Sequence, residues 1–493
     1  MFKTIYIRNF RNGWATNSSS THSVIYKNKD EMLNDLNVME LNYYDRATNT
    51  IAASKEAKIK YVALNMWWHD GLMRTLCAIY PTMQQYVDLM REQEKKFESG
   101  EIEFEDRKYG MYVRGNLSFG EIKNFESSLD FIRKIIDNDN IAIVGGSDEL
   151  DFVYDTIEEH IELERPAYDS KVVKNGNYWV NYDSFGKRLR FSIDDKPLKP
   201  DYPELIDLHI TNKCQHNCSF CYQNSTDDSQ HADIDFIKRL FWNVHDYYPS
   251  SAKIEFAIGG GNILLYPQLR ELFEFLTGRG HIINTTLNAK DLPTLSKDKE
   301  MFELFNKNVK GVGISVSTME DVFLAQKFAE EHLGFTKDLI NYVEPDADKE
   351  FKPYCVVHLI PEYLGLKKSV DYIMRLREYY PFLFLGFKRL GRGISRKIQD
   401  FNETELKILC NRSRCLSIDT CFANTYKDYL VKNFATENTI TYYEGEFSMY
   451  VDAVNKKAYK SSYQKDKAYN LYGDEYANIP CTFAQIRKDN NLE

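Results

Sequence analysis

The arrangement of apolar and polar positions changes after Pro203, at the end of a proline-rich joint over Lys196–Pro203. Beyond the joint, apolar runs of strand length alternate with stretches of helical periodicity, such as Asp233–Val244 and Lys368–Tyr379. Six such strand–helix units predict a parallel sheet that curls into a partial (β/α)6 barrel of the TIM type. The strands expected in it are Leu205–Thr211, Ile254–Ile258, His281–Leu287, Val312–Val316, Cys355–Ile360 and Phe382–Phe387.

The segments on either side of this region show other patterns. Residues 1–200 mix short apolar runs with helical patterning over residues 52–97, and Tyr178–Tyr182 with Leu189–Ile193 predicts a strand hairpin. We therefore expect an α/β chain in three parts. These are an α+β domain over residues 1–200, the partial barrel over residues 201–395, and a small extension with a further hairpin over residues 396–493.

Composition narrows the classes of function. The 493 residues carry a net charge of −10, which disfavours a broad binder of nucleic acid, although a local basic groove would still fit this charge. No apolar run approaches membrane length and the start has no secretory pattern, so we expect a cytoplasmic protein without a membrane partner. In that reducing compartment, the nine cysteines are expected as thiols or metal ligands and not as disulfides.

Three of these cysteines crowd together directly after the first expected barrel strand. Cys214, Cys218 and Cys221 form a C-x3-C-x2-C array. In a chain with this cysteine content, chance would produce the spacing roughly 0.003 times. Three thiolates on one loop can hold three corners of a [4Fe–4S] cluster, which normally takes four cysteines. The fourth iron would then be open to a ligand from outside the protein.

A zinc knuckle is the competing interpretation of the array, with His216 or a distant cysteine as the fourth ligand. Structural zinc sites usually combine one C-x2-C unit with a second pair downstream. The chain has no second C-x2-C unit and no H-x3-H unit. The spacing therefore favours an iron–sulfur cluster, and a non-catalytic iron–sulfur or zinc-binding protein stays as an alternative.

The array resembles the signature of the radical S-adenosylmethionine (radical SAM) superfamily, with Phe220 as the aromatic residue before the last cysteine. The resemblance covers about residues 200–395. It implies an enzyme in which the amino and carboxylate groups of SAM chelate the open iron. One-electron cleavage of the sulfonium then gives a 5′-deoxyadenosyl radical that abstracts hydrogen from a substrate. The implied cofactors are a [4Fe–4S] cluster and SAM, and the implied partner is a reductant protein of the flavodoxin or ferredoxin type.

The same resemblance indicates residues for SAM. The segment Gly259–Asn262 follows the second strand and looks like the Gly-Gly-Glu motif that binds the methionine amino group, with Asn262 where Glu is usual. Asparagine keeps an acceptor oxygen and loses the charge. Polar residues recur at other strand ends, where a parallel barrel places its ligands. The expected SAM contacts are Phe220, Gly259, Gly260, Gly261, Asn262, Asn284, Asn288, Ser315, Ser317, His358, Lys388 and Arg392. For His358, a hydrogen-bonded core histidine is the alternative.

The C-terminal part looks like the SPASM or twitch extension that often binds auxiliary clusters in this family. Its cysteine spacing does not match the usual signature, and Ser461 and Ser462 stand where a cysteine would be expected. The candidate ligands of a second cluster are Cys410, Cys415, Cys421 and Cys481, and buried apolar cysteines are the alternative.

The substrate is the part that the sequence determines least. Family members with an N-terminal domain and a hairpin before the barrel often modify peptides or proteins, and a peptide can lie along an edge strand. We therefore predict hydrogen abstraction from a peptide or protein. Radical modification of a nucleoside or nucleic acid is the alternative, for which a more basic face would be expected.

Overall fold

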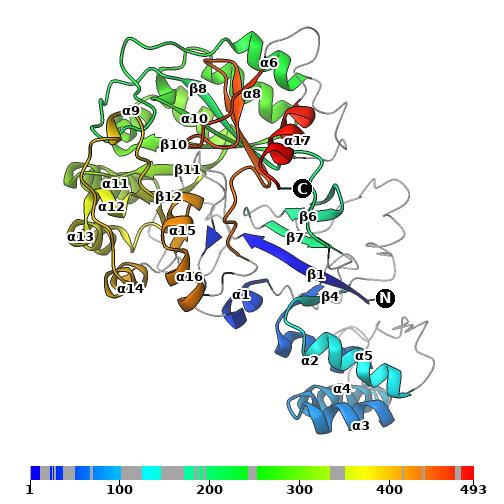
Figure 1. The fold of residues 1–493 in the computed structure, drawn as a ribbon. Helices are drawn as coiled ribbons and strands as arrows, with labels where there is room; N and C mark the ends of the chain where they lie inside the picture. Colours follow the sequence, from blue (N-terminus) through cyan, green and yellow to red (C-terminus); the bar gives the residue numbers. More distant parts are fainter. Residues whose placement is uncertain are drawn as a thin grey trace.

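The computed structural model shows a partial barrel with helices on its outside, beside a smaller N-terminal sheet and a group of N-terminal helices (Figure 1). The residues that the structure describes are 2–11, 23–24, 26, 29–36, 50–66, 70–101, 125–145, 171–182, 186, 188–192, 196–242, 253–333, 350–412, 416–434, 436, 439–471 and 479–492.

Six neighbouring parallel strands form the wall of the barrel in sequence order, which confirms the six strands expected from the apolar runs. The first of them, β8, is buried along its whole length because both of its faces are covered. Its residues Ile206, Leu208 and Ile210 belong to the hydrophobic core, and the alternate positions face the barrel interior. The six are β8 (Leu205–Thr211), β9 (Glu255–Gly260), β10 (Ile282–Asn288), β11 (Val309–Ser315), β12 (Tyr354–Leu359) and β13 (Phe382–Phe384).

The C-terminal part extends this sheet at both edges. β14 (Leu416–Ile418) pairs in parallel with β13, and β15 (Ser448–Asp452) pairs in parallel with β8. Beyond β15 follow β16 (Lys457–Tyr459) and β17 (Tyr469–Asn470), both antiparallel, and β2 (Ser23–Val24) pairs with β14. The second expected hairpin is confirmed as β15–β16. The boundary expected at residue 396 does not divide the sheet, because segments after it supply strands to both edges.

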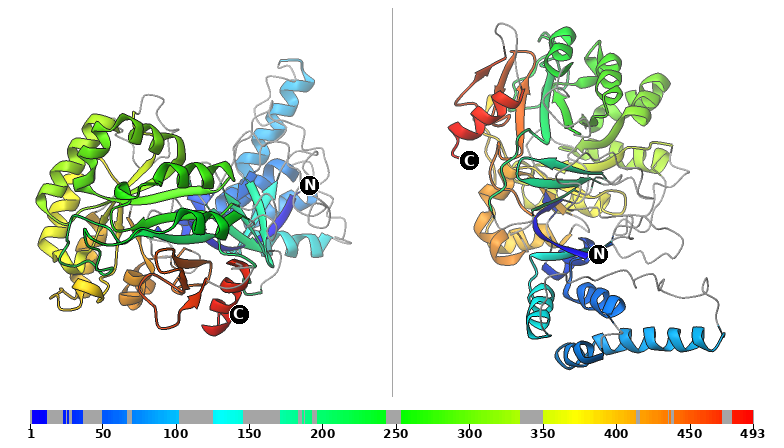
Figure 2. Two further views of the ribbon diagram at one scale, coloured as in Figure 1. Left: turned by 90° about the horizontal axis from the view of Figure 1, so that it is seen from above. Right: turned by 90° about the vertical axis from the view of Figure 1, so that its right-hand side faces the viewer.

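Amphipathic helices cover the outside of the barrel sheet (Figures 1 and 2). Their buried side chains, such as Phe241, Phe273 and Ile373, join those of the strands in one continuous core. The helices are α6 (Ile234–Trp242), α8 (Leu269–Gly278), α9 (Leu292–Lys297), α10 (Lys299–Asn308), α11 (Met319–His332), α12 (Pro361–Leu364), α13 (Leu366–Leu376), α14 (Glu403–Arg412), α15 (Thr420–Thr425), α16 (Lys427–Asn433) and α17 (Ile479–Asp489). Among the helices described, none has the length and apolarity needed to cross a membrane.

The N-terminal part contains an antiparallel sheet in the order β3-β4-β1-β7-β6-β5. The expected hairpin is present as β6–β7. Helices α2 to α5 pack around a core of their own, which includes Ala63, Leu76 and Ile136. The strands and helices are β1 (Phe2–Arg11), α1 (Lys29–Leu36), β3 (Thr50–Ala52), α2 (Lys55–Met66), α3 (Asp70–Ile79), α4 (Met83–Glu98), α5 (Phe125–Ile136), β4 (Ile141–Gly145), β5 (Lys171–Asn175), β6 (Tyr178–Tyr182) and β7 (Arg188–Ser192).

The proline-rich joint runs along the turn between β5 and β6. The Asn175 side chain accepts hydrogen bonds from the backbone N–H groups of Asp201 and Tyr202. Gly176 has a φ of +64°, and a Cβ at this position would lie 1.7 Å from the carbonyl oxygen of Lys199. The turn therefore needs glycine for its left-handed backbone and for this close approach. The joint is consequently held by side-chain and backbone contacts where it enters the barrel.

A buried ionic network connects the N-terminal sheet to the base of the barrel. Arg188 on β7 donates to Glu204, which precedes β8, at 3.0 Å, and also to Glu255 on β9. Arg190 donates to Glu204 from Nε at 2.9 Å. Burial works against the charge of Glu204, yet Arg190 and Arg188 together hold the pKa of its carboxyl below the usual range. The two arginines of β7 thus bind the N-terminal ends of the first barrel strands and link them to the N-terminal sheet.

Candidate active site

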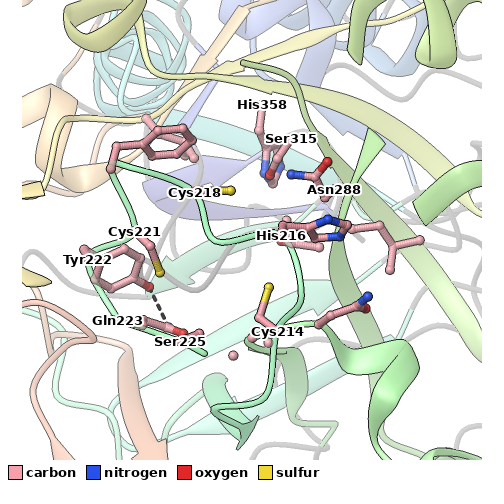
Figure 3. Close-up of a pocket in the computed structure, with 18 of the residues that line it drawn as sticks. Cys214, His216, Cys218, Cys221, Tyr222, Gln223, Ser225, Asn288, Ser315 and His358 are labelled. Carbon is pink, nitrogen blue, oxygen red and sulfur yellow. Dashed lines mark hydrogen bonds between the residues drawn. The ribbon is translucent and has the colours of Figure 1, made fainter. Parts of the chain in front are cut away.

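The three array cysteines lie on one loop that leaves β8 and folds back on itself. The backbone N–H of Cys214 donates to the carbonyl oxygen of Thr226 at 2.8 Å, which closes the loop at its base. Figure 3 shows the sulfur atoms of Cys214, Cys218 and Cys221 directed into the space that the loop borders. All three line one pocket at the C-terminal ends of the barrel strands, the position where parallel barrels keep their chemistry.

Two arginines in the segment after β13 donate hydrogen bonds to the carbonyl groups of this loop. Arg392 donates from Nε to the carbonyl oxygen of Cys218 and from its backbone N–H to that of Cys221, both at 2.9 Å. Arg396 donates from Nε to the carbonyl oxygen of Ser219 at 2.8 Å. These bonds use backbone acceptors and leave the cysteine side chains free to bind a ligand. Arg392 and Arg396 therefore hold the shape of the loop.

Burial disfavours the thiolate forms of Cys214 and Cys218 in the absence of a cation. It raises the pKa of Cys214, and it raises the pKa of Cys218 to about 11, with further contributions from the neighbouring thiols of Cys214 and Cys221. A bound metal centre reverses this balance, because a positive charge stabilises the thiolates that ligate it. The loop therefore brings together three thiols that repel one another as anions and need a cationic partner.

A row of polar side chains crosses the opposite wall of the pocket. Asn288 at the end of β10 pairs with Ser315 at the end of β11, and Ser315 pairs with His358 near the end of β12. All three line the pocket, as Figure 3 shows. His358 is 2% exposed and sits over Gly313, where a Cβ would lie 2.0 Å from the imidazole Cε1 atom. Glycine at this position thus makes room for the histidine ring.

The glycine segment after β9 packs against the base of the cysteine loop. Gly261 donates from its backbone to the carbonyl oxygen of Thr211 at 2.6 Å, and Asn262 donates to that of Lys213 at 2.8 Å. A Cβ on Gly261 would lie 2.1 Å from the Lys213 oxygen, and Gly260 has a φ of +132°. The glycines are therefore required for the close approach of two strand ends.

Asp291 and His216, which were not expected to contact SAM, also line the pocket. Asp291, just before α9, accepts a hydrogen bond from His216 Nε2 at 2.8 Å and from Asn262 Nδ2 at 2.9 Å. The Asn262 amide is also within hydrogen-bond distance of Gln215, at 3.2 Å. No local pattern marks Asp291 in the sequence. The only signal was its position three residues after Asn288, at a strand end that was already expected to bind a ligand.

Most of the residues expected to contact SAM lie at the pocket wall. Those lining it are Phe220, Gly259, Gly260, Gly261, Asn262, Asn288, Ser315, His358 and Lys388. Their contact with SAM stays a prediction.

The structure places three of the expected SAM residues elsewhere, which corrects those expectations. Asn284 lies four residues before Asn288, about 13 Å back along the same strand. It donates from Nδ2 to Glu255 Oε1 at 2.6 Å, in the network at the base of the barrel. Ser317 donates from its hydroxyl to Asp321, within the capping box that starts α11. Arg392 binds the carbonyls of the cysteine loop and does not line the pocket.

Lys388 brings a positive charge to the side of the pocket near the C-terminal part. Its Nζ lies 4.7 Å from the ring centre of Tyr222 and 5.0 Å from that of Tyr463. Tyr222 donates to the hydroxyl of Ser462, one of the two serines found where a cluster cysteine was considered. Cation–π contacts of this kind orient an ammonium group while leaving its N–H donors available. Lys388 is therefore suited to hold a carboxylate.

The C-terminal cysteines occupy dissimilar surroundings. Cys410 on α14 is 7% exposed and belongs to the hydrophobic core. Cys421 on α15 packs against Gly386, whereas Cys481 on α17 is exposed. Cys415 lies outside the described residues. A second cluster held by these residues stays a prediction, and for Cys410 the described contacts match the apolar alternative.

The donor set of the array fits a [4Fe–4S] cluster. Within the described parts of the chain, no three His, Cys, Asp or Glu side chains converge closely enough to hold a single metal ion. A zinc site requires such convergence, whereas a cubane ligates each thiolate to a different iron. His216, considered above as a zinc ligand, is engaged by Asp291. Cys214, Cys218 and Cys221 would hold the cluster, which together with SAM supplies the reductive cleavage of the sulfonium.

Residues 208–341 match the family model of the radical SAM superfamily. This range begins within β8 and includes all three array cysteines. A search of curated proteins found no match to the chain.

Solved structures similar to this chain include three of SuiB from Streptococcus suis. The crystal structure of SuiB matches with 12% identity and a TM-score of 0.40, over 57% of this chain and 66% of SuiB. SuiB bound to its precursor peptide SuiA matches with 11% identity and a TM-score of 0.41, over 57% of this chain and 65% of SuiB. In both, the match spans less than two thirds of the SuiB chain.

SuiB bound to S-adenosylmethionine matches with 10% identity and a TM-score of 0.41, over 94% of this chain and 88% of SuiB. TM-scores this low support no conclusion about this chain. The identification rests instead on the family match, the cysteine spacing and the parallel strands that present the cysteines. These features together show that the chain contains a radical SAM domain over residues 208–341.

Proposed function

We propose that this enzyme uses a [4Fe–4S] cluster and SAM to abstract hydrogen from a peptide or protein substrate. The observation that carries the chemistry is the loop of three thiols, which opens into a pocket at the C-terminal ends of the barrel strands without a fourth cysteine among the residues lining it. An iron without a protein ligand is available to SAM. The reducing electron would come from a flavodoxin- or ferredoxin-like protein.

The shape of the N-terminal sheet supports a polypeptide substrate. Among the described residues, β5 is hydrogen-bonded to β6 on one side and to no strand on the other, so it forms an edge of that sheet. An extended peptide can add to such an edge through backbone hydrogen bonds, with specificity from alternate side chains. The net charge of −10 is less suited to a nucleic acid.

The cofactor chemistry can be tested on protein reconstituted with iron and sulfide without oxygen. Dithionite and SAM should then yield 5′-deoxyadenosine, and each of Cys214→Ala, Cys218→Ala and Cys221→Ala should abolish it. The matched control is Cys77→Ala, which removes a partly buried cysteine on α3 outside the pocket and should leave the cleavage of SAM intact. Persistence of 5′-deoxyadenosine formation in the three array variants would contradict the assignment.

The substrate class needs a separate readout, because SAM can be cleaved without a substrate. Candidate peptides and nucleosides, deuterated at carbon, would be offered to the reconstituted enzyme, and deuterium would be measured in 5′-deoxyadenosine. We expect label to arrive from a peptide. Label that arrives from a nucleoside and never from a peptide would replace our proposal by the nucleoside alternative.

A further inference from the structure

Asp291 is the one carboxylate among the described residues that line the pocket. It is 4% exposed and lies just before α9, at the position that would cap this helix. Its side chain makes no capping hydrogen bond and turns to the cysteine loop instead. A buried carboxylate that faces a ligand pocket is stabilised by donors from its surroundings or from the ligand. Asp291 can therefore bind a ligand only if its oxygens can accept hydrogen bonds beyond those from the protein.

The hydrogen bonds of Asp291 leave one oxygen with room for another donor. Its Oδ1 atom accepts from Asn262 at 2.9 Å and from His216 at 2.8 Å, with a longer contact to Gln215 at 3.4 Å. Its Oδ2 atom accepts from the same His216 nitrogen at 2.9 Å. An ionised carboxylate has about four lone-pair sites. The described residues thus leave acceptor capacity on Oδ2.

Asn262, in contrast, is engaged by the protein. Its Oδ1 atom accepts from the backbone N–H of Leu264 at 3.0 Å and so caps the short 3-10 helix Ile263–Leu265. Its Nδ2 atom donates to Asp291 and to Gln215. The amide also carries no charge, so it is a weak partner for an amino group. Asp291, which follows another strand, therefore places a carboxylate next to Asn262.

We propose that Asp291 supplies the carboxylate that accepts a hydrogen bond from the amino group of SAM, at the place where Asn262 lacks one. This inference rests on the radical SAM chemistry proposed above. His216 is a positioning residue, because its N–H spans both oxygens of Asp291 and fixes the orientation of the carboxylate. A purely structural Asp291 would only tether the cysteine loop to α9. The two roles differ in what they predict for a ligand without an amino group.

The test compares two ligands on anaerobic reconstituted enzyme. One is SAM, and the other is the analogue in which hydrogen replaces the α-amino group. Dissociation constants for both are measured by equilibrium dialysis, with iron content as the check on cluster loading. Asp291→Asn should weaken the binding of SAM by about tenfold or more, since a hydrogen bond to a charged group is lost. The analogue should bind nearly as it does to the wild type, so the preference for SAM should fall by the same factor.

Two further variants distinguish a direct effect of the carboxylate on SAM from an effect on the structure of the cysteine loop. His216→Gln keeps the carboxylate and removes the imidazole that orients it, so it should lose part of the preference for SAM, a smaller part than Asp291→Asn loses. Asn262→Glu combined with Asp291→Asn returns a carboxylate from the neighbouring position and should restore the preference. If Asp291→Asn does not load the cluster, restored loading and preference in the double variant support the proposal, and failure of the double variant to load overturns it.

Other results would also overturn the assignment of Asp291. One is equal weakening of both ligands in Asp291→Asn, and another is a loss of preference in His216→Gln as large as in Asp291→Asn. Failure of the proposed function looks different. In that case the wild-type protein itself would not bind SAM or would take up no cluster, whatever the residue at position 291.

Discussion

Arg392 donates from its guanidinium Nε to the carbonyl oxygen of Cys218 at 2.9 Å, across 174 residues of sequence. The same side chain reaches the carbonyl oxygen of Ser225 through Nη1, also at 2.9 Å. One arginine thereby fixes two turns of the loop that presents the cluster ligands. Its removal should loosen the ligands without removing a thiol.

Arg392→Ala should therefore lower the retention of the cluster. Hydrogen bonds from a charged donor contribute about 1.5–3 kcal/mol each, so their loss should speed the release of iron to a chelator by tenfold or more. Iron release from the reconstituted protein would be followed by absorbance. The control is Arg389→Ala, which removes an exposed arginine near the same segment and should release iron at the wild-type rate. Equal rates in the two variants would show that Arg392 does not support the loop.

A second prediction concerns the buried network at the base of the barrel. Arg188→Met leaves the carboxylates of Glu204 and Glu255 without one of their cationic partners. Breaking a buried ion pair from one side typically costs about 3–5 kcal/mol, because the remaining charge stays out of water. The free energy of unfolding, measured in urea, should fall by this order. Lys432→Met breaks an exposed pair with Glu403 and should change it little. A small loss in Arg188→Met would contradict the role of the network.

A third prediction uses the close contact below His358. Gly313→Ala would place a Cβ 2.0 Å from the imidazole, so the ring or the β11 strand must move. Overpacking of this kind costs about 1–3 kcal/mol, and it should also weaken SAM binding because His358 lines the pocket. Thermal unfolding and equilibrium dialysis would measure the two effects. Gly278→Ala, where nothing lies within 4 Å of the added Cβ, should leave both unchanged or slightly raise the stability.

The six barrel strands were predictable because each is a compact apolar run, and the period of the pattern needs no tertiary information. The pairing of β15 with β8 was not predictable. Hairpin periodicity identifies β15 and β16, but no local signal says which distant edge they join. β14 was missed because Ser417 interrupts its short apolar stretch, whereas β13 lies within the longer apolar run Phe382–Phe387. The C-terminal part thus looked like a separate unit although it extends the barrel sheet at both edges.

The site, like the fold, combines features that a local sequence pattern predicts with features that depend on tertiary contacts. The spacing of Cys214, Cys218 and Cys221 is a local property, and the sequence contains it completely. Every second residue of a barrel strand faces the interior, from the base of the barrel to its mouth. Asn284 was therefore placed wrongly, because this alternation does not say which of the inward-facing residues lie at the mouth. Asp291 was missed because a single aspartate in a loop has no pattern. Only its contacts with His216 and Asn262 reveal it.

The last prediction concerns Glu362 on α12, whose pKa is raised to about 8 by burial and, to a lesser extent, by Asp419 and Asp400. The unfolded chain ionises this carboxyl near 4.5, whereas the folded protein keeps its proton up to about pH 8. Between these values the folded state binds more protons, so the free energy of unfolding falls as the pH rises, by at most about 1.4 kcal/mol per pH unit. Glu362→Gln removes this contribution, so its stability relative to the wild type should increase steadily between pH 5 and 8 in urea titrations. Glu303→Gln, an exposed change on α10, should give a curve parallel to that of the wild type. Parallel curves for Glu362→Gln as well would mean that this carboxyl does not hold its proton in the folded protein.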